Sequence, residues 1–455
     1  MPGNAARQGQ KGGRNVPDEE GIQYAGIEIA SMIDAGKKRL RCRLLCVQPV
    51  SPKEAQRMKP SWHYRPERNW INDPNGLVHF GGWYHMFYQY NPNGDQWGDI
   101  HWGHARSRDL LHWETLPVAL TPDEARGELH CFSGGCCKDA QGRPHFFYTS
   151  IGAQENGRDC VHGAQQWMAA PADDDLTTLV QTDAYALTDD IHGGMHVRDW
   201  RDPCVLRYAG QYLMVLGGCV EERGCVLLYT SADMQHWTYR HILAQSETAD
   251  GIPWECPNLA QVDGRFVLIY SPCGAVHAKI GDLDSELRFC EERDEILEPE
   301  RNGFYAPQVF RDEDGRTILI GWMPEADRVA HKGWSGVMSL PRLLSVTGEG
   351  LTAAPVPGAE HLPGVTRFQT AQSELPKTFR IHDNGEERTL LTLTADGQLL
   401  LDRSASSLSD GPEKQAISRT VPIRAVNDLF IAVDGSAVEV MVNGKWLSAR
   451  IYPTK

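Results

Sequence analysis

A hairpin-bearing unit that recurs along the chain is the feature that most constrains its fold. Each copy has a Pro, Cys or Gly-rich start, an apolar run, a turn that contains Gly, and a second apolar run. The five copies read "DPNGLVHFGGWYHMFYQ", "GGCCKDAQGRPHFFYTS", "DPCVLRYAGQYLMVLGG", "CPNLAQVDGRFVLIYSP" and "APQVFRDEDGRTILIGW". They begin near residues 73, 134, 202, 256 and 306, about 60 residues apart. A repeat of this length indicates a fold built from similar units.

A nearly literal echo supports the same interpretation. The segment "SRDLLHW" at residues 107–113 returns as "SADMQHW" at residues 231–237, a distance of two units. Five hairpin units with little helix signal predict an all-β fold that begins with a five-bladed β-propeller of four-stranded blades. An irregular β-sandwich is the alternative, and it explains the repeated hairpins less well.

The pattern changes near residue 356. In "NDLFIAVDGSAVEVMVNGKWLSARIY", apolar and polar residues alternate around Asp434-Gly435 and Asn443-Gly444, which are strong hairpin signals. We therefore expect a C-terminal β-sandwich at residues 356–455, after a propeller domain at residues 59–355 that carries the candidate chemistry. Residues 1–58 form an N-terminal extension that we expect to be partly disordered or to contain a short helix. Its helix-like apolar residues are Ile22, Ala25, Ile29 and Ile33.

Composition excludes several classes of function. The formal net charge of −15 argues against nucleic acid as a partner, because phosphate backbones require a basic surface. No run reaches the roughly 18 apolar residues of a membrane span, and the first residues lack the apolar stretch of a secretory signal. The twelve cysteines contain no C-x-x-C pair, so we expect free thiols and no metal site. These features predict a cytoplasmic protein without a membrane partner.

Three carboxylates share one phase of the repeat. Asp73 and Asp202 stand immediately before a Pro at the start of their units, and Glu255 stands before Cys-Pro in "WECPNLA". In a propeller, equivalent positions of different blades surround one axis, so the three side chains are expected to converge in the central channel. Taken singly, Asp73 is explained by a turn cap, Asp202 by a salt bridge to Arg201 and Glu255 by solvation. Three acids in register are better explained by a site that uses their charge.

Two converging carboxylates are typical of glycoside hydrolysis. One carboxylate attacks the anomeric carbon in its ionised form, and the other donates a proton to the leaving oxygen. The third is able to hold hydroxyl groups of the sugar. A Trp lies close before each of the three, and aromatic rings supply apolar faces for a sugar. The chemistry requires neither a metal nor an organic cofactor.

The residues around these acids resemble glycoside hydrolase family 32, the invertases, sucrose-6-phosphate hydrolases, levanases and exo-inulinases. The matching blocks, in order, are "WINDPNG", "QYNP", "WGDIHWGHARSRDLLHW", "CFSGG", "WRDP", "WECP", "FYAPQ" and "GWSGVMSLPR". The resemblance implies a five-bladed propeller followed by a β-sandwich, and retaining hydrolysis of terminal β-D-fructofuranosides. It implies that Asp73 is the nucleophile, Glu255 the acid/base and Asp202 the transition-state stabiliser.

The resemblance also implies a set of sugar contacts, with Trp70 placed beside the nucleophile. The other implied contacts are Asn72, Gln89, Trp97, Phe132, Ser133 and Arg201. Trp322 and Trp334 are interpreted equally well as pocket wall and as core. Three departures stand out: residues 1–58 have no counterpart, "RNGFYAPQ" lacks the acid that often precedes "FYAPQ", and "PRLL" replaces Pro-Arg-Glu-Leu.

Two alternatives stay open, a fructosyltransferase that uses the same site and a propeller that binds fructans without cleaving them. The expected partner is a small sugar, namely sucrose, sucrose 6-phosphate or a short fructo-oligosaccharide. A phosphorylated substrate requires basic residues near the leaving glucose, for which Arg158, Lys279 and Lys332 are candidates. A monomer and a homodimer through an exposed sandwich edge are both compatible with the sequence.

Overall fold

A computed structural model describes residues 51–152, 164–326, 329, 332–409 and 411–455. The apolar pattern from Ile22 to Ile33 lies outside the described residues. The first described element is the short helix α1 (Pro52–Met58), in which Ser51 and Glu54 form a reciprocal capping box. Among the described residues, no helix has the length and apolar character that crossing a membrane requires.

Nearly all other described elements are strands, and those up to residue 355 form five sheets in which all pairs but one are antiparallel. The first sheet contains β1 (Asn69–Phe80), β2 (Trp83–Asn91), β3 (His101–Ser107) and β4 (Trp113–Leu120), and the second contains β5 (Glu128–Lys138), β6 (Pro144–Gly152), β7 (Ala164–Pro171) and β8 (Leu179–Leu187). The third sheet contains β9 (Arg198–Tyr208), β10 (Gln211–Val220), β11 (Arg223–Ser231) and β12 (Trp237–Gln245). The fourth contains β13 (Glu255–Val262), β14 (Arg265–Ser271), β15 (Val276–Leu283) and β16 (Phe289–Glu298).

The fifth sheet has a more irregular path. It consists of β17 (Tyr305–Arg311), β18 (Thr317–Met323), β20 (Val337–Met338), β21 (Arg342–Thr347) and β22 (Gly350–Pro355). Between β18 and β20, the short strand β19 (Trp334–Ser335) leaves this sheet and pairs in parallel with β1. The first sheet therefore contains strands from the beginning and the end of this part of the chain.

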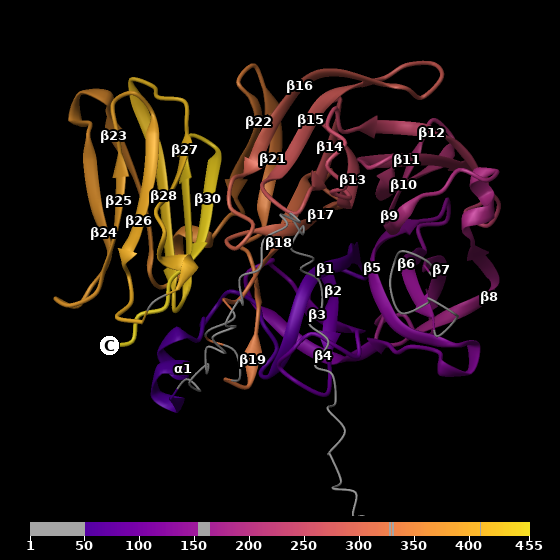
Figure 1. Ribbon diagram of the computed structural model, residues 1–455, viewed down its shortest axis with the longest axis horizontal. Coiled ribbons are helices and arrows are strands. Elements are labelled where there is room, and N and C mark those ends of the chain that lie inside the picture. The colour runs from indigo at the N-terminus through magenta and orange to yellow at the C-terminus, as the bar shows by residue number, and fades with distance from the viewer. Residues whose placement is uncertain (1–50, 153–163, 327–328, 330–331, 410) are drawn as a thin grey trace, which may run out of the picture. The chain divides into compact units, whose positions relative to one another are not determined.

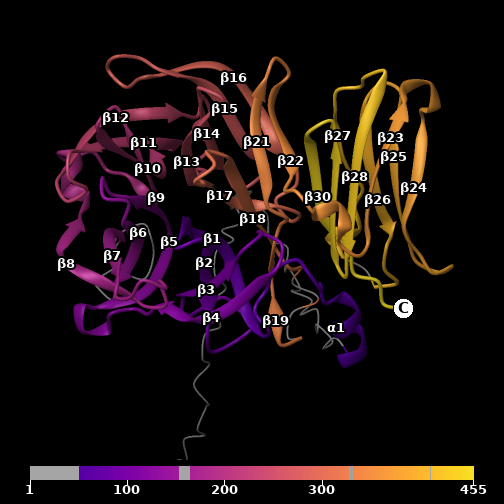
Figure 2. The same cartoon turned by 180° about the vertical axis from the view of Figure 1, so that it is seen from behind.

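The first strands of the five sheets contact one another in a closed ring. β1 contacts β5, β5 contacts β9, β9 contacts β13, β13 contacts β17, and β17 contacts β1. Figure 1 shows the sheets following one another in this order, and the reverse view in Figure 2 shows the same succession. Large side chains fill the space between neighbouring sheets; Phe87, Trp102, Phe146 and Tyr148 pack together between the first two. This is the arrangement of a β-propeller.

Tight turns explain why the repeated segments form hairpins. At Gly81-Gly82, between β1 and β2, and at Asp263-Gly264, between β13 and β14, both central residues have positive φ. Turns of this type match the right-handed twist of the flanking strands. The Gly-containing segments that mark the repeat are therefore the inner hairpin turns of successive sheets.

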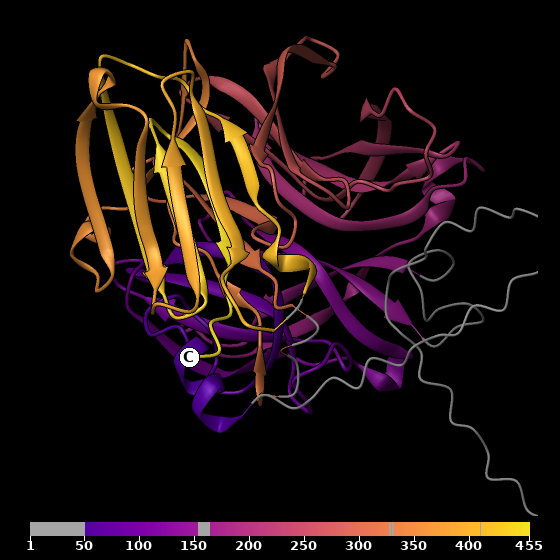
Figure 3. The ribbon, with the colours of Figure 1, turned by 60° about the vertical axis from the view of Figure 1, so that its left-hand side comes forward.

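The chain after residue 364 folds into two four-stranded sheets. One sheet contains β23 (Val365–Ala371), β28 (Val426–Asp434), β29 (Ala437–Val442) and β30 (Lys445–Arg450). The other contains β24 (Lys377–Asp383), β25 (Arg388–Leu393), β26 (Gln398–Ala405) and β27 (Ile417–Thr420). Leucines and valines of both sheets share one core, and Figure 3 shows the two layers. Burial alternates along β25 and β26, whereas β29 is buried at every residue. Two sheets that face each other across a shared core form a β-sandwich, as the hairpin signals predict.

The remaining elements are single turns of 3-10 helix. They are η1 (Glu124–Arg126), η2 (Asp189–His192), η4 (Ala359–His361), η5 (Gln372–Glu374) and η6 (Pro412–Lys414).

A buried charge network joins the sandwich to the sheets before it. Arg342 of β21 contacts Glu298 of β16 at 2.7 Å and Glu439 of β29 at 2.5 Å. His63, which precedes β1, lies 2.9 Å from Glu439 and 3.1 Å from Asp434. Arg342 is the Arg of the block "PRLL". This block differs from Pro-Arg-Glu-Leu only at Leu343, so the buried Arg is retained.

Candidate active site

Each innermost strand of the ring carries a β-bulge at the same phase. The register shifts span residues 71–74 of β1, 131–134 of β5, 201–204 of β9, 255–258 of β13 and 305–308 of β17. A bulge frees two residues from the ladder and redirects their side chains. The sequence-predicted residues Asp73, Ser133 and Asp202 lie inside these bulges, and Glu255 lies at the edge of one.

Proline contributes to the strained backbone at these positions. Asp202, Cys256 and Ala306 each precede a Pro and have φ values of +65°, +47° and +45°. Positive φ is costly for residues other than Gly, and the residue before Pro is also restricted. Strain of this kind is retained where the surrounding structure fixes it, and it is common at functional sites.

Asp73 is held by side chains from two neighbouring sheets. Ser133 Oγ donates a hydrogen bond to Asp73 Oδ2 at 2.5 Å, and Gln89 Nε2 lies 3.4 Å from the same oxygen. Asn72 Nδ2 donates to Oδ1 at 3.1 Å. Gln89 also donates to Ser133, so the carboxylate and its donors form one connected group.

A second chain of hydrogen bonds orients these donors. Trp70 Nε1 donates to Asn72 Oδ1 at 2.8 Å, and Asn72 Nδ2 donates to Gln89 Oε1 at 2.9 Å. Asn72 and Gln89 are both buried. Because each amide uses its oxygen as an acceptor and its nitrogen as a donor, their orientations toward Asp73 are fixed by the network.

Cys256 connects the nucleophile candidate to Asp202. Its thiol Sγ lies 3.4 Å from Asp73 Oδ2 and 3.5 Å from Asp202 Oδ2. The backbone N–H of Cys256 donates to Asp202 Oδ2 at 2.9 Å, and the N–H of Asp202 donates to Thr149 Oγ1 at 2.9 Å. Asp202 is only 5% exposed. Two of the three predicted carboxylates therefore meet at one thiol.

Glu255 is held from both sides. Arg201 Nη2 donates to Glu255 Oε1 at 2.6 Å, and the Tyr305 hydroxyl donates to Oε2. The thiol of Cys273 lies 3.3 Å from the same Oε2. Arg201 Nε also lies 3.8 Å from Asp202 Oδ2, so this guanidinium links the second and third carboxylates. The structure thus brings Asp73, Asp202 and Glu255 together in one cluster.

Arg201 is itself positioned by a carboxylate that the sequence does not single out. Asp199 Oδ1 accepts from Arg201 Nη1 at 2.8 Å, and Asp199 Oδ2 accepts from Arg198 Nη1 at 3.0 Å. Asp199 has a φ of +56°. The segment "RDWRDP" therefore supplies two arginines and two acids in alternation, and only one of its acids faces the cluster.

Burial and charge shift the pKa values of the three carboxylates in different directions. Burial raises the pKa of Asp73, and the nearby charge of Glu255 adds to this rise. Burial raises the pKa of Asp202 to about 7, although Arg201 opposes the shift. Burial also acts to raise the pKa of Glu255, but the charge and hydrogen bond of Arg201 outweigh it, and the net shift is downward. The three acids titrate as a coupled group.

Aromatic side chains gather around Phe132, the residue before Ser133 in the bulge of β5. Trp97 and Phe132 make an edge contact with ring centroids 6.1 Å apart, and His130 lies 5.5 Å from Trp97. Trp97 is 38% exposed, which is unusual for a Trp and leaves part of the indole open to solvent. An exposed indole provides apolar surface of the kind that a sugar ring packs against.

The tryptophans near the other carboxylates occupy different places. Trp200 and Trp254 are buried in the sheets: Trp200 Nε1 donates to the Tyr229 hydroxyl, and Trp254 stacks on Tyr270. The expectation that a Trp beside each acid offers a face to the sugar is therefore wrong for these two. Trp70 and Trp322 contact each other edge to face, with centroids 5.8 Å apart.

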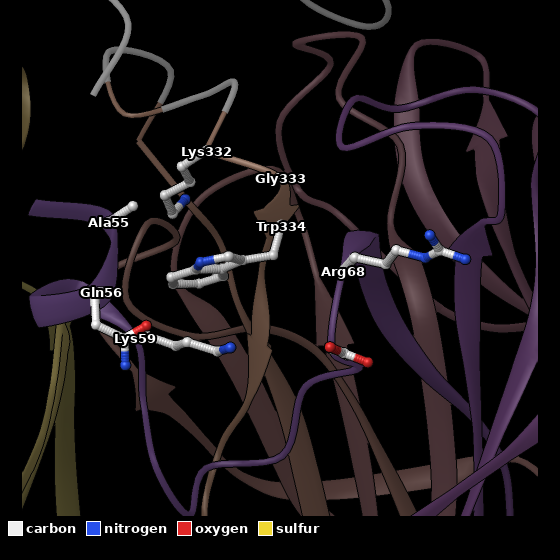
Figure 4. A pocket seen from close by; sticks show the side chains of 8 residues that line it. Ala55, Gln56, Lys59, Arg68, Lys332, Gly333 and Trp334 are labelled. Carbon is white, nitrogen blue, oxygen red and sulfur yellow. The ribbon is translucent and has the colours of Figure 1, made fainter. Parts of the chain in front are cut away.

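Trp334 lies against a separate cavity. It is 4% exposed, and Lys332 Nζ and Arg65 Cζ lie 4.0 Å and 5.1 Å from its ring centroid. Figure 4 shows Lys332 above this indole, with Lys59 on the other side of the cavity. The cavity measures about 580 Å³, and residues of α1 and of the segment before β1 line it. Two cations thus lie over the Trp334 ring.

Sequence reasoning missed four residues that contact the cluster or its partners. They are Asp199, Cys256, Cys273 and Tyr305. Cys256 and Tyr305 stand inside the quoted blocks "WECP" and "FYAPQ", so their position was an available signal. Asp199 and Cys273 carry no such signal, because only the folded chain brings them beside Arg201 and Glu255.

Comparison with known proteins identifies the family of this chain. The model of the glycosyl hydrolases family 32 N-terminal domain matches residues 63–355. A sucrose-6-phosphate hydrolase from Escherichia coli is 31% identical over 450 residues, which cover 87% of this chain and 89% of that protein. A raffinose invertase from Escherichia coli is 30% identical, with 92% of this chain and 94% of that protein covered.

Solved structures show the same fold. A sucrose-6-phosphate hydrolase from Lactobacillus gasseri superposes with a TM-score of 0.76 at 23% identity, covering 88% of this chain and 90% of that one. A mutant β-fructofuranosidase from Bombyx mori in complex with sucrose gives a TM-score of 0.72 at 26% identity, covering 89% and 90%. The chain belongs to glycosyl hydrolase family 32 and is a glycosidase.

Proposed function

We propose that this protein is a β-fructofuranosidase that hydrolyses terminal β-D-fructofuranosyl residues of sucrose, sucrose 6-phosphate or short fructo-oligosaccharides. The observation that carries the proposal is the cluster of Asp73, Asp202 and Glu255, which three bulged strands bring together around Cys256 and Arg201. The names of the curated relatives support the substrate class.

We also propose that the five sheets of the ring are the five blades of the catalytic domain at residues 59–355, with the sandwich domain at 356–455 and an N-terminal extension at 1–58. The nine cysteines within the described residues are free thiols, which fits the cytoplasmic location expected from the sequence.

In the first step, an ionised Asp73 oxygen attacks the anomeric carbon of the fructosyl unit. The bond from that carbon to the glycosidic oxygen breaks, and Glu255 gives its proton to the departing oxygen. The product is a fructosyl ester of Asp73. Ser133, Asn72 and Gln89 hold the carboxylate before attack, so little reorganisation is required.

In the second step, water replaces the leaving sugar. Glu255, now ionised, takes a proton from the water, whose oxygen attacks the same carbon and releases Asp73. Two displacements return the original configuration. Retaining enzymes place their two carboxyl groups about 5–5.5 Å apart, and we expect this separation between Asp73 and Glu255 when a sugar is bound. Asp202 stabilises the positive charge on the sugar and binds its hydroxyl groups.

The proton on this cluster must move when the sugar binds. In the empty site Arg201 favours the ionised form of Glu255, whereas the raised pKa of Asp202 favours a proton there. We infer that the three acids share one proton at neutral pH. Sugar hydroxyls that donate to Asp73 and Asp202 stabilise their ionised forms, so the proton passes to Glu255, where it is needed.

The remaining predicted residues have roles that follow from their contacts. Trp97 and Phe132 offer apolar surface to the furanose edge, and Trp70 with Trp322 forms a second aromatic pair. Trp334, enclosed by Lys332 and Arg65, is assigned to the structural support of β1 through the pairing of β19.

The test is release of free fructose from sucrose, sucrose 6-phosphate, a short fructo-oligosaccharide and inulin at equal concentrations. We expect release by the intact protein and a loss of at least about 10³-fold in Asp73→Ala, since a nucleophile cannot be replaced by binding energy alone. His236→Ala, an exposed substitution on the third sheet, is the folding control. Transfer of fructose to sugar in place of water would support the fructosyltransferase. If folded protein released fructose from none of these sugars, the proposed enzyme activity would be rejected.

A further inference from the structure

The guanidinium of Arg301 lies next to the side chains that contact Glu255 Oε2. Arg301 stacks over the ring of Tyr305, with Cζ 4.8 Å from the ring centroid, and the hydroxyl of that ring donates to Glu255 Oε2. Arg301 Nη1 lies 3.5 Å from the carbonyl oxygen of Cys273. The thiol of Cys273 is exposed and lies 3.3 Å from the same Oε2. Arg301 therefore lies against the two residues, Tyr305 and Cys273, whose side chains contact Glu255 Oε2.

The positive charge of Arg301 lacks a counter-charge in contact with it within the part of the chain that the structure describes. Among the described residues no carboxylate forms an ion pair with this guanidinium. The lysines suggested by the sequence are different: Lys279 contacts two carboxylates at 2.7 and 2.8 Å, and Lys332 contacts one at 3.1 Å. Arg158 lies outside the described residues. An unpaired, half-buried Arg beside a cluster of acids is available for an anion from outside.

A tight turn fixes Arg301 in this place. The N–H groups of Gly303 and Phe304 both donate to the carbonyl of Glu300, at 2.9 and 3.0 Å, so the chain doubles back before β17. A Cβ on Gly303 would lie 1.9 Å from the carbonyl oxygen of Ser448 in β30. No side chain fits here, which explains why the chain lacks the acid that often precedes "FYAPQ".

We propose that Arg301 binds an anionic group on the leaving sugar, the phosphate of sucrose 6-phosphate. The inference rests on the proposed function, because an acid that protonates the glycosidic oxygen lies next to the leaving sugar, and Glu255 has that role there. Arg binds phosphate through two parallel N–H donors, and the stack on Tyr305 limits the rotation of its side chain. Four of the curated relatives carry the name sucrose-6-phosphate hydrolase.

The same contact affects the proton on Glu255. The positive charge of Arg301 is one of the influences that lower the pKa of this acid in the empty site. A bound phosphate offsets that charge, so Glu255 holds its proton more readily in the complex. A phosphorylated leaving group thus gains binding energy and also favours the protonation state that the first step requires.

The experiment compares kcat/KM for sucrose 6-phosphate and for sucrose in the full chain and three variants. Arg301→Ala removes the cation, Arg301→Lys keeps the charge without the planar fork, and Arg240→Ala changes an exposed Arg on β12 as the control. We expect Arg301→Ala to lose about 10- to 100-fold with sucrose 6-phosphate and less than about 3-fold with sucrose. Arg301→Lys is expected to lose less, and the control nothing.

Binding of glucose 6-phosphate and of glucose, measured by calorimetry, gives a readout that does not depend on turnover. The proposal is supported if glucose 6-phosphate binds more tightly than glucose and Arg301→Ala abolishes this difference. An equal loss of kcat/KM with both substrates would overturn it, because Arg301 would then act through Tyr305 and Glu255 alone. Hydrolysis of sucrose 6-phosphate that Arg301→Ala leaves unchanged would overturn this inference and leave the proposed function standing. Hydrolysis of neither sugar would overturn both.

Discussion

At the scale of single residues, the site is a cluster of acids whose charges are balanced unequally. Arg201 lies between Glu255 and Asp202 but contacts Glu255 at 2.6 Å and Asp202 at 3.8 Å. Because Coulomb energy falls with distance, the nearer acid keeps its charge, and burial decides the state of the other. Arg201, the Arg of the block "WRDP", thus sets which acid holds the proton before the sugar binds.

The pH dependence of kcat/KM tests this balance. With one proton shared by the three acids, as proposed above, the pKa of about 7 at Asp202 predicts that activity falls as the pH rises through this value. Asp202→Asn replaces a charge by a neutral amide, so Glu255 loses its proton at lower pH and the basic limb moves downward. The rate falls about 10²- to 10³-fold as well, because a stabilising charge is lost. If the basic limb of the kcat/KM profile lay at the same pH in both proteins, this limb would belong to another titrating group.

At the scale of elements, the bulge is what converts a strand into a part of the site. In β5 the bulge places Ser133 against Asp73, and the next residue, Gly134, packs its backbone against the neighbouring strand β6. A Cβ on Gly134 would lie 1.9 Å from the carbonyl oxygen of Phe147, so any side chain forces the two strands apart. The sequence "CFSGG" indicates this position, but the close approach of the backbones is visible only in the fold.

Gly134→Ala is therefore expected to reduce activity by displacing Ser133 from Asp73. The change is also expected to lower the free energy of unfolding by roughly 1–3 kcal/mol, the typical cost of overpacking. Gly348→Ala is the matched control, because a Cβ there meets nothing within 4 Å. Fructose release and urea-induced unfolding measure the two effects. Normal activity in a stable Gly134→Ala protein would contradict the role given to this bulge.

At the scale of the whole molecule, the sandwich is tied to the ring by buried charges. His63 has a raised pKa: burial acts to lower it, but hydrogen bonds to Asp434 and Glu439 outweigh burial. The pKa of Glu439 is lowered to about 2, since the charge of Arg342 and the bond to His63 overcome its burial. Buried charges of this kind stabilise only while every partner keeps its charge.

The stability of the full chain should therefore depend on His63. Because its folded pKa is above its unfolded value, the stabilisation is complete below about pH 6.5 and is lost as the pH rises through the folded pKa. His63→Gln is expected to lower the free energy of unfolding by roughly 3–5 kcal/mol at pH 6, and by less at high pH. His236→Gln, at an exposed pair with Asp233, serves as control in urea unfolding. A constant difference between the two proteins at all pH values would refute the titration of His63.

The sequence by itself determined the periodic parts of this protein. Hairpin units, turn residues and alternating strands follow from local rules of backbone and burial, and the phase of Asp73, Asp202 and Glu255 followed from the repeat. Tertiary structure alone decided what each acid touches. Asp199, Cys273 and Arg301 come from loops and strand ends whose residues carry no local signal, and Trp200 and Trp254 face the core although they stand beside the acids. Contacts across the ring depend on distances between segments far apart in the chain, and no local pattern encodes these distances.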